Sequence, residues 1–157
     1  MPRVLSKEAV EEIDALCARY PSRLAAMLPA LHVAQREAGK IDDDVEMDVA
    51  EALDVPPARV REATTFYTMF YQEDVGKYVI KICRNLACQL RGADRIMEKA
   101  KAVLGVDFGE TTPDGKITLE HEECLASCGT GPMLWCNDNF VENLDEQKLE
   151  TFLASLK

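Results

Sequence analysis

Hydrophobic residues recur at the spacing of an α-helix through roughly the first seventy residues of the chain. The first apolar stripe follows Ser6, a residue type that commonly caps helices, and it ends before Pro21. Further helices are predicted over 22–39, 44–53 and 58–71. Short amphipathic helices that follow one another closely bury their apolar faces against each other. This half of the chain is therefore predicted to form a compact helical bundle.

Three residues are expected to shape the bundle locally. Asp44 is expected to cap the third helix, and Gly39 to end the second one. Pro29 falls inside the second helix. Because proline has no backbone N–H and its ring clashes with the preceding turn, we expect a kink there.

The pattern changes at Lys77, where short β-rich segments alternate with one amphipathic stretch and a final helix. The expected elements are a strand over 77–83, a helix over 94–105, a turn and strand over 112–122, a hairpin over 132–142 and a helix over 143–156. This β-α-β-β-α order, with an additional early strand or irregular stretch, is typical of a small α/β domain. The predicted fold class is α+β, with a helical domain over 1–75 and an α/β domain over 76–157.

Composition and charge narrow the possible partners. The chain is 47% hydrophobic and 29% charged, as is ordinary for a globular protein with a real core. Its formal net charge is −10, which disfavours nucleic acids and anionic membrane surfaces as partners. Acidic runs such as "DDDVEMD" also disfavour a helix-turn-helix DNA reader. The longest apolar stretch is too short to span a membrane, and the first residues lack a signal-peptide pattern. We therefore expect a cytoplasmic location.

Four of the six cysteines form two spaced pairs at the edges of predicted loops. Cys83 and Cys88 are spaced C-x4-C, and Cys124 and Cys128 are spaced C-x3-C. In a reducing compartment such pairs indicate metal or redox chemistry, and four thiolates suit either zinc or an iron–sulfur cluster. Zinc knuckles and thioredoxin dithiols usually have C-x2-C, so the spacing favours a [2Fe–2S] cluster over both.

The remaining cysteines and the histidines are predicted to be spectators. Cys17 lies on an apolar helix face, and Cys136 lies in the strand "MLWC", close to the second pair in sequence. Both are expected to be buried as small hydrophobic residues. His121 could replace a ligand, but it is expected to face solvent, and His32 has no visible partner in the sequence.

Two glycines and two arginines lie close to the cysteine pairs in the sequence. Gly129 and Gly131 would let backbone N–H groups approach cluster sulfurs, because no Cβ stands in the way. The start of the helix after Cys88 would also point N–H groups toward a negatively charged cluster. Arg84 and Arg91 are interpreted as ordinary surface charges that could add to this stabilisation.

Four stretches of the sequence carry a resemblance to a known family. "TTFYTMF", "CRNLACQLRGA", "TPDGKITLE" and "ECLASCGTGPMLWCNDN" resemble the small thioredoxin-like [2Fe–2S] subunit of bacterial complex I, the NuoE type. The resemblance covers nearly the whole chain. It implies a thioredoxin-like second domain and a [2Fe–2S] cluster held by Cys83, Cys88, Cys124 and Cys128.

The same resemblance implies a function and a partner. The protein is expected to carry single electrons between its cluster and the FMN of an NADH-binding flavoprotein subunit, the NuoF type, in the peripheral arm of an NADH:quinone oxidoreductase. It would be attached to the inner membrane only through that complex. The chain offers no phosphate-cradling glycine loop and no nucleophile–base pair, so NADH and FMN are assigned to the partner and no catalytic residue to this chain.

Two alternatives remain open. Within the family, the chain could be the equivalent subunit of an NAD-linked hydrogenase or formate dehydrogenase. Outside it, the four cysteines could hold zinc in an interaction module with no redox role. The aromatic stretch "FYTMFY", residues 66–71, is expected either to contact the flavoprotein or to belong to the core of the helical domain.

Overall fold

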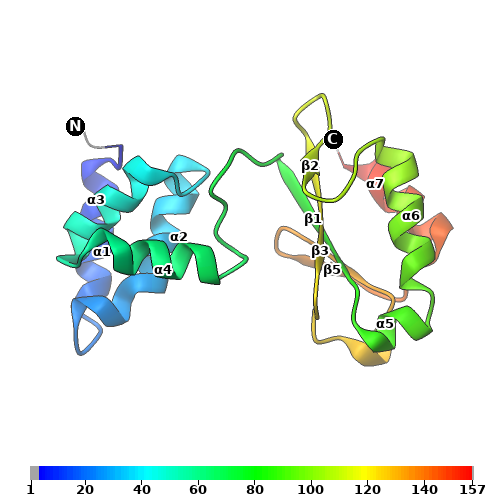
Figure 1. Cartoon of the computed structure of the whole chain (residues 1–157), viewed down its shortest axis with the longest axis horizontal. Helices are drawn as coiled ribbons and strands as arrows, with labels where there is room; N and C mark the ends of the chain where they lie inside the picture. Colours follow the sequence, from blue (N-terminus) through cyan, green and yellow to red (C-terminus); the bar gives the residue numbers. More distant parts are fainter. Residues whose placement is uncertain (1–3, 157) are drawn as a thin grey trace. The chain divides into compact units, whose positions relative to one another are not determined.

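The computed structural model describes residues 4–156 and divides into two compact units between Asp74 and Val75 (Figure 1). The first unit is helical. The second unit is a mixed β-sheet with helices, and each unit buries a hydrophobic core of its own. The predicted α+β class is confirmed. Within the described residues, no helix is both long enough and apolar enough to cross a membrane.

The helical unit packs its helices around aliphatic side chains. Its elements are α1 (Lys7–Cys17), a 3₁₀ turn η1 (Arg23–Ala26), α2 (Met27–Ala38), α3 (Asp43–Leu53) and α4 (Pro57–Phe66). Helix α1 contacts α2 and α3, and α4 contacts α3 and α2. Large side chains that are fully buried in this core include Ile13, Leu31, Ile41, Val45, Val49 and Leu53.

Local hydrogen bonds correct two predictions for this unit. Helix α3 is capped by Asp42, whose carboxylate accepts a hydrogen bond of 3.1 Å from the Val45 N–H, so the prediction of Asp44 as cap is wrong. Ser22 begins a 3₁₀ turn, and the α-helix starts only at Met27. Pro29 therefore lies in the first turn of α2, where its missing N–H removes no helical hydrogen bond. The prediction that it interrupts the interior of a continuous helix is wrong.

The second unit is built on a five-stranded sheet in the order β2-β3-β1-β4-β5. The strands are β1 (Tyr78–Cys83), β2 (Glu110–Thr111), β3 (Ile117–Glu122), β4 (Leu134–Cys136) and β5 (Asn139–Val141). The central strand β1 runs parallel to β3 and antiparallel to β4, and β4 and β5 form the expected hairpin. The two-residue β2 lies at one edge of the sheet, in a segment for which the sequence predicted no strand.

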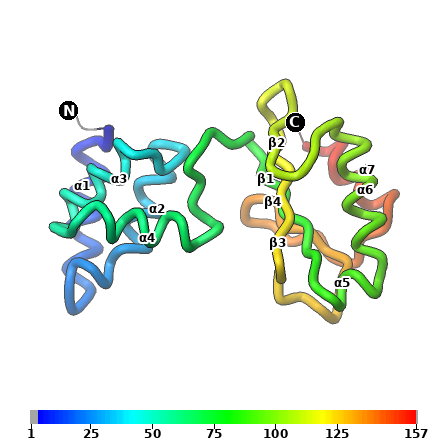
Figure 2. Tube along the Cα trace, viewed as in Figure 1, coloured from blue at the N-terminus to red at the C-terminus, as the bar shows by residue number. Residues whose placement is uncertain are grey.

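The helices of this unit lie on one side of the sheet (Figure 1). They are α5 (Leu86–Leu90), α6 (Ala93–Leu104) and α7 (Glu146–Ser155), and α6 lies beside α7 (Figure 2). The strand residues beneath them that are completely buried are Ile80, Ile82, Leu119 and Leu134. Where β1 ends, α5 contacts the short 3₁₀ turn η2 (Cys128–Thr130), so the two cysteine-bearing segments meet at the same end of the sheet.

Candidate metal centre

The first cysteine pair is buried at the end of the central strand. Cys83 is the last residue of β1, and Cys88 lies within α5 rather than in a loop. Both side chains are buried, with exposed fractions of 2% and 1%. Burial, together with the neighbouring Cys83 and Cys128, raises the pKa of the Cys88 thiol to about 11. Crowded thiols of this kind repel one another once ionised, and a bound metal relieves that repulsion.

The second pair lies in the loop that follows β3. Cys124 and Cys128 are both exposed, and Cys128 is the first residue of η2. The Ala126 N–H donates to the Cys124 sulfur over 3.4 Å. The contact between α5 and η2 brings the segment of Cys128 to the segment of Cys88, and Cys124 lies in the same loop as Cys128. Within residues 4–156, no three His, Cys, Asp or Glu side chains are gathered closely enough around one point to hold a single metal ion.

Two contacts join α5 and its C-terminal neighbour Arg91 to residues 129–131. The Arg91 guanidinium donates a hydrogen bond of 2.8 Å to the carbonyl of Gly129. Gly131 packs directly on Cys88, because a Cβ at position 131 would lie 2.8 Å from the Cys88 Sγ. A Cβ at Gly129 would meet nothing within 4 Å. Of the two glycines singled out in the sequence, only Gly131 is required by close packing.

The charged residues beside the first pair are paired with neighbours. Arg84 forms an ion pair of 2.7 Å with Glu123, and its guanidinium lies 3.4 Å from the His121 Nε2. His121 is exposed, as expected from its place in the strand, and its ring packs against Phe108. Arg84 therefore anchors the start of the second loop to the first segment.

The structure separates Cys136 from the site in spite of its closeness in sequence. Cys136 pairs with Ile80, three residues before Cys83 along β1, which is about 10 Å at the rise of a β-strand. It is buried beneath the helices, and burial raises the pKa of its thiol. Cys17 is likewise buried, in the core of the helical unit.

A carboxylate behind the second loop gave no signal in the sequence. Glu142, just after β5, accepts hydrogen bonds from the hydroxyls of Ser127 and Thr130, which flank Cys128. None of the three residues belongs to a recognisable motif, and Glu142 is more than ten positions from both of its partners. Only the folding of the β4–β5 hairpin onto the loop brings them together.

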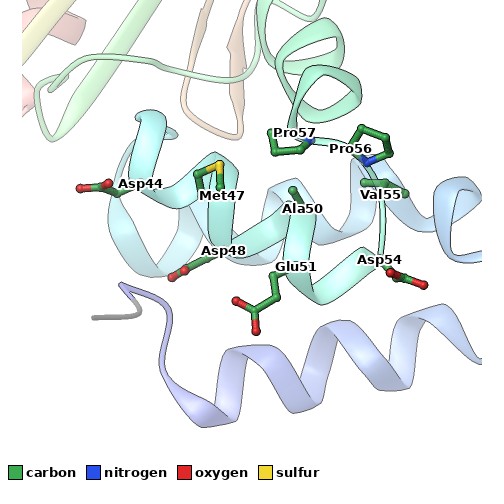
Figure 3. Close-up of a pocket in the computed structure, with 9 residues that line it drawn as sticks. All are labelled: Asp44, Met47, Asp48, Ala50, Glu51, Asp54, Val55, Pro56 and Pro57. Carbon is green, nitrogen blue, oxygen red and sulfur yellow. The ribbon is translucent and has the colours of Figure 1, made fainter. Parts of the chain in front are cut away.

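A cavity of ≈ 690 Å³ in the helical unit contains no thiol. It lies along α3 and the segment leading into α4 (Figure 3). Asp44, Met47, Asp48, Ala50, Glu51, Asp54, Val55, Pro56 and Pro57 line it. One of its carboxylates already has a structural role, since Asp48 accepts hydrogen bonds from the N–H groups of Val4 and Leu5.

Comparison with known proteins decides the family. The family model for thioredoxin-like [2Fe–2S] ferredoxins matches residues 13–157. The chain belongs to the thioredoxin-like [2Fe–2S] ferredoxin family. This confirms the resemblance found in the sequence, and a [2Fe–2S] cluster is the cofactor of this ferredoxin.

Similar proteins extend over most of the chain. An NADH-quinone oxidoreductase subunit of Rhizobium meliloti is 40% identical over 94% of this chain and 88% of its own length. An NADH-quinone oxidoreductase subunit of Rickettsia prowazekii is 37% identical over 94% of this chain and 85% of its own. The mitochondrial NADH dehydrogenase [ubiquinone] flavoprotein 2 of Dictyostelium discoideum is 35% identical over 99% of this chain and 64% of its own.

One solved structure shares the fold of the ferredoxin. A chain of an NAD⁺-reducing [NiFe]-hydrogenase in the air-oxidised state superposes with a TM-score of 0.73. The alignment covers 83% of this chain but 22% of the hydrogenase chain, at 19% sequence identity. At this identity the likeness establishes the fold alone.

Proposed function

We propose that this ferredoxin is the one-electron carrier subunit of an NADH:quinone oxidoreductase and that Cys83, Cys88, Cys124 and Cys128 ligate its cluster. The observation that carries the ligand assignment is the buried Cys83–Cys88 pair at the end of β1 and in α5, together with the contact between α5 and the turn η2 that begins at Cys128. The relatives named as subunits of NADH-quinone oxidoreductase support the host complex.

The donor set fits a [2Fe–2S] cluster. Each iron of such a cluster takes two protein ligands, and thiolates are the ligands that iron–sulfur clusters prefer. One pair is held by β1 and α5, and the other by the loop after β3. When bound, the cluster supplies the capacity to accept and release a single electron.

The residues of the chain then fix the surroundings of that cluster. Cys83 and Cys88 exclude water on one side, and Gly131 keeps the backbone close to the Cys88 sulfur. Arg91 adds a positive charge to the joined loops, which favours the anionic thiolates. Hydrogen bonding, burial and nearby charge are the means by which a protein sets a cluster potential.

The partner proposed for this ferredoxin is an FMN- and NADH-binding flavoprotein subunit, through which it would join the peripheral arm of a membrane-associated complex. An electron carrier that lacks its own nucleotide site needs a neighbour that delivers electrons. A soluble NAD-linked hydrogenase or formate dehydrogenase would supply the same kind of neighbour. Enzymatic assay of the co-purified complex with quinone, hydrogen and formate separates the three hosts.

Metal analysis tests the cluster. Protein purified without oxygen should contain about two iron and two acid-labile sulfide per chain, because four thiolates saturate one [2Fe–2S] cluster. Dithionite-reduced samples should give a rhombic EPR signal from one unpaired spin. Stoichiometric zinc without iron in such preparations would instead identify a zinc-stabilised module.

Substitution of Phe66 tests the proposed contact with the flavoprotein subunit. It is 76% exposed at the end of α4, whereas Phe70 of the same aromatic stretch is 5% exposed and belongs to the core. The stretch therefore divides between surface and core. Because exposed aromatics often dominate interfaces, Phe66→Ala should weaken co-elution with the co-expressed flavoprotein, with affinity lower by on the order of tenfold or more.

Val103→Ala is the matched control, since Val103 is a 46% exposed hydrophobic residue of the other unit. It should leave co-elution unchanged. Equal co-elution of the wild type and Phe66→Ala would remove Phe66 from the interface, and failure of the wild type to co-elute would refute the partner.

A further inference from the structure

Glu142 forms a compact hydrogen-bonded group with two hydroxyls of the second cysteine loop. Its Oε1 accepts from the Thr130 hydroxyl over 2.6 Å and also from the Ser127 hydroxyl. The two hydroxyl oxygens are themselves 2.6 Å apart. Hydrogen bonds to an ionised carboxylate are among the strong ones in proteins, so this group is a firm attachment point.

The attachment lies immediately next to a proposed ligand. Ser127 precedes Cys128, and Thr130 ends the 3₁₀ turn that Cys128 begins. The backbone makes the same connection, because the Asn143 N–H donates to the Thr130 carbonyl over 2.6 Å. The segment after β5 therefore holds the turn from behind, while Arg91 and Gly131 hold it against the first cysteine pair.

The environment keeps Glu142 charged. The hydrogen bonds from Ser127 and Thr130 lower the pKa of its carboxyl group, and the Lys148 ammonium lowers it further. The Lys148 ammonium also donates to the backbone carbonyl of Glu142. A fixed negative charge consequently stands behind the turn that carries Cys128. Reduction adds an electron to a cluster, so a nearby negative charge opposes it and lowers the potential.

We propose that Glu142 is a positioning residue, which holds the 127–130 turn and thereby the Cys128 thiolate in place, and whose charge lowers the reduction potential of the cluster. The inference rests on the proposed function, in which Cys128 is a ligand. Glu142 positions Cys128 through Ser127 and Thr130, whereas its charge acts on the cluster through space.

Two substitutions in the full-length, cluster-loaded protein separate the two roles. Glu142→Ala removes both hydrogen bonds to the carboxylate and leaves the two hydroxyls only each other and the Ser127 carbonyl as partners within the turn. It should lose its cluster to a chelator about tenfold faster than the wild type, followed by visible absorbance. Glu142→Gln keeps an acceptor oxygen but removes the charge. It should retain its cluster within about twofold of the wild type, yet show a more positive midpoint potential in an EPR-monitored redox titration.

Asp138→Asn is the matched control, because Asp138 is an exposed carboxylate at the β4–β5 turn, the opposite end of the hairpin. It removes the same charge and should match the wild type in both measurements. If Glu142→Ala releases its cluster at the rate of Asp138→Asn, the positioning role is refuted. If Glu142→Gln has the potential of Asp138→Asn, the role of the charge is refuted.

Thr130→Val provides a second route should Glu142→Ala fail to fold. It removes one hydroxyl donor at nearly constant shape and should also accelerate cluster loss. The outcome for the wild type keeps the two proposals distinct. Wild-type protein without iron and sulfide refutes the proposed function, whereas a loaded wild type whose Glu142 variants behave like Asp138→Asn refutes only the inference about Glu142.

Discussion

Gly131→Ala is expected to displace the Cys88 thiol and to prevent stable cluster binding. The added Cβ would lie 2.8 Å from the Cys88 Sγ, which is too close for the sulfur to stay in place, whereas its distance of 3.5 Å from the Cys88 Cα is an ordinary contact. The backbone at Gly131 (φ −68°, ψ 163°) is open to any residue, so lack of space alone is responsible. Iron content should fall sharply, and the free energy of unfolding should decrease by about 1–3 kcal/mol, as for other overpacked sites.

Gly129→Ala is the internal control for this result. Gly129 has open space at its Cβ position and does not adopt the left-handed conformation. We expect its iron content and thermal unfolding midpoint to match those of the wild type. Normal iron content in Gly131→Ala would mean that Cys88 does not bind the cluster in the position seen here.

Cys88→Ser should abolish or severely weaken cluster assembly. A serine oxygen is a harder and poorer ligand for iron than a thiolate, and burial at 1% exposure leaves no room for water to substitute. The variant should also be less stable than the cluster-loaded wild type, because binding of the cluster contributes to the stability of the folded site. Iron and sulfide analysis, together with thermal unfolding of the purified variant, measures both effects.

Cys136→Ser is the matched comparison, since Cys136 is also buried but lies farther back along the sheet. It should keep a full cluster and lose on the order of 1 kcal/mol of stability from burying a hydroxyl. The reverse pattern, with iron lost in Cys136→Ser and retained in Cys128→Ser, would make Cys124 and Cys136 the second pair of ligands.

The arrangement of the elements follows from local sequence signals. The predicted and the observed elements differ where two such signals compete. Asp42 and Asp44 are both acceptable caps, and only the hydrogen bond to Val45 decides between them. Pro29 sits in a continuous apolar stripe, which conceals that the preceding residues form a 3₁₀ turn. Periodicity reports which side of a segment is apolar and does not distinguish the two helix types over one turn.

The four cysteines proposed as ligands stand out in the sequence because ligand chemistry restricts both residue type and spacing. Their supports cannot be found in this way. Gly129 and Gly131 are equivalent in sequence, and only tertiary packing places one of them on Cys88. Glu142 is one of many acidic residues in this chain. Its role depends on the hairpin bringing distant hydroxyls to one carboxylate, which is a long-range property that no local pattern records.

The unequal burial of the two cysteine pairs makes one side of the proposed metal centre more accessible to reactive molecules than the other. Cys83 and Cys88 are buried at the end of β1 and in α5, whereas Cys124 and Cys128 are exposed in the loop that follows β3. Oxidants and alkylating reagents attack accessible thiolates, so damage would begin at the second loop and progress inward. A partner that covers this loop would therefore act as a shield against oxygen as well as an electron donor.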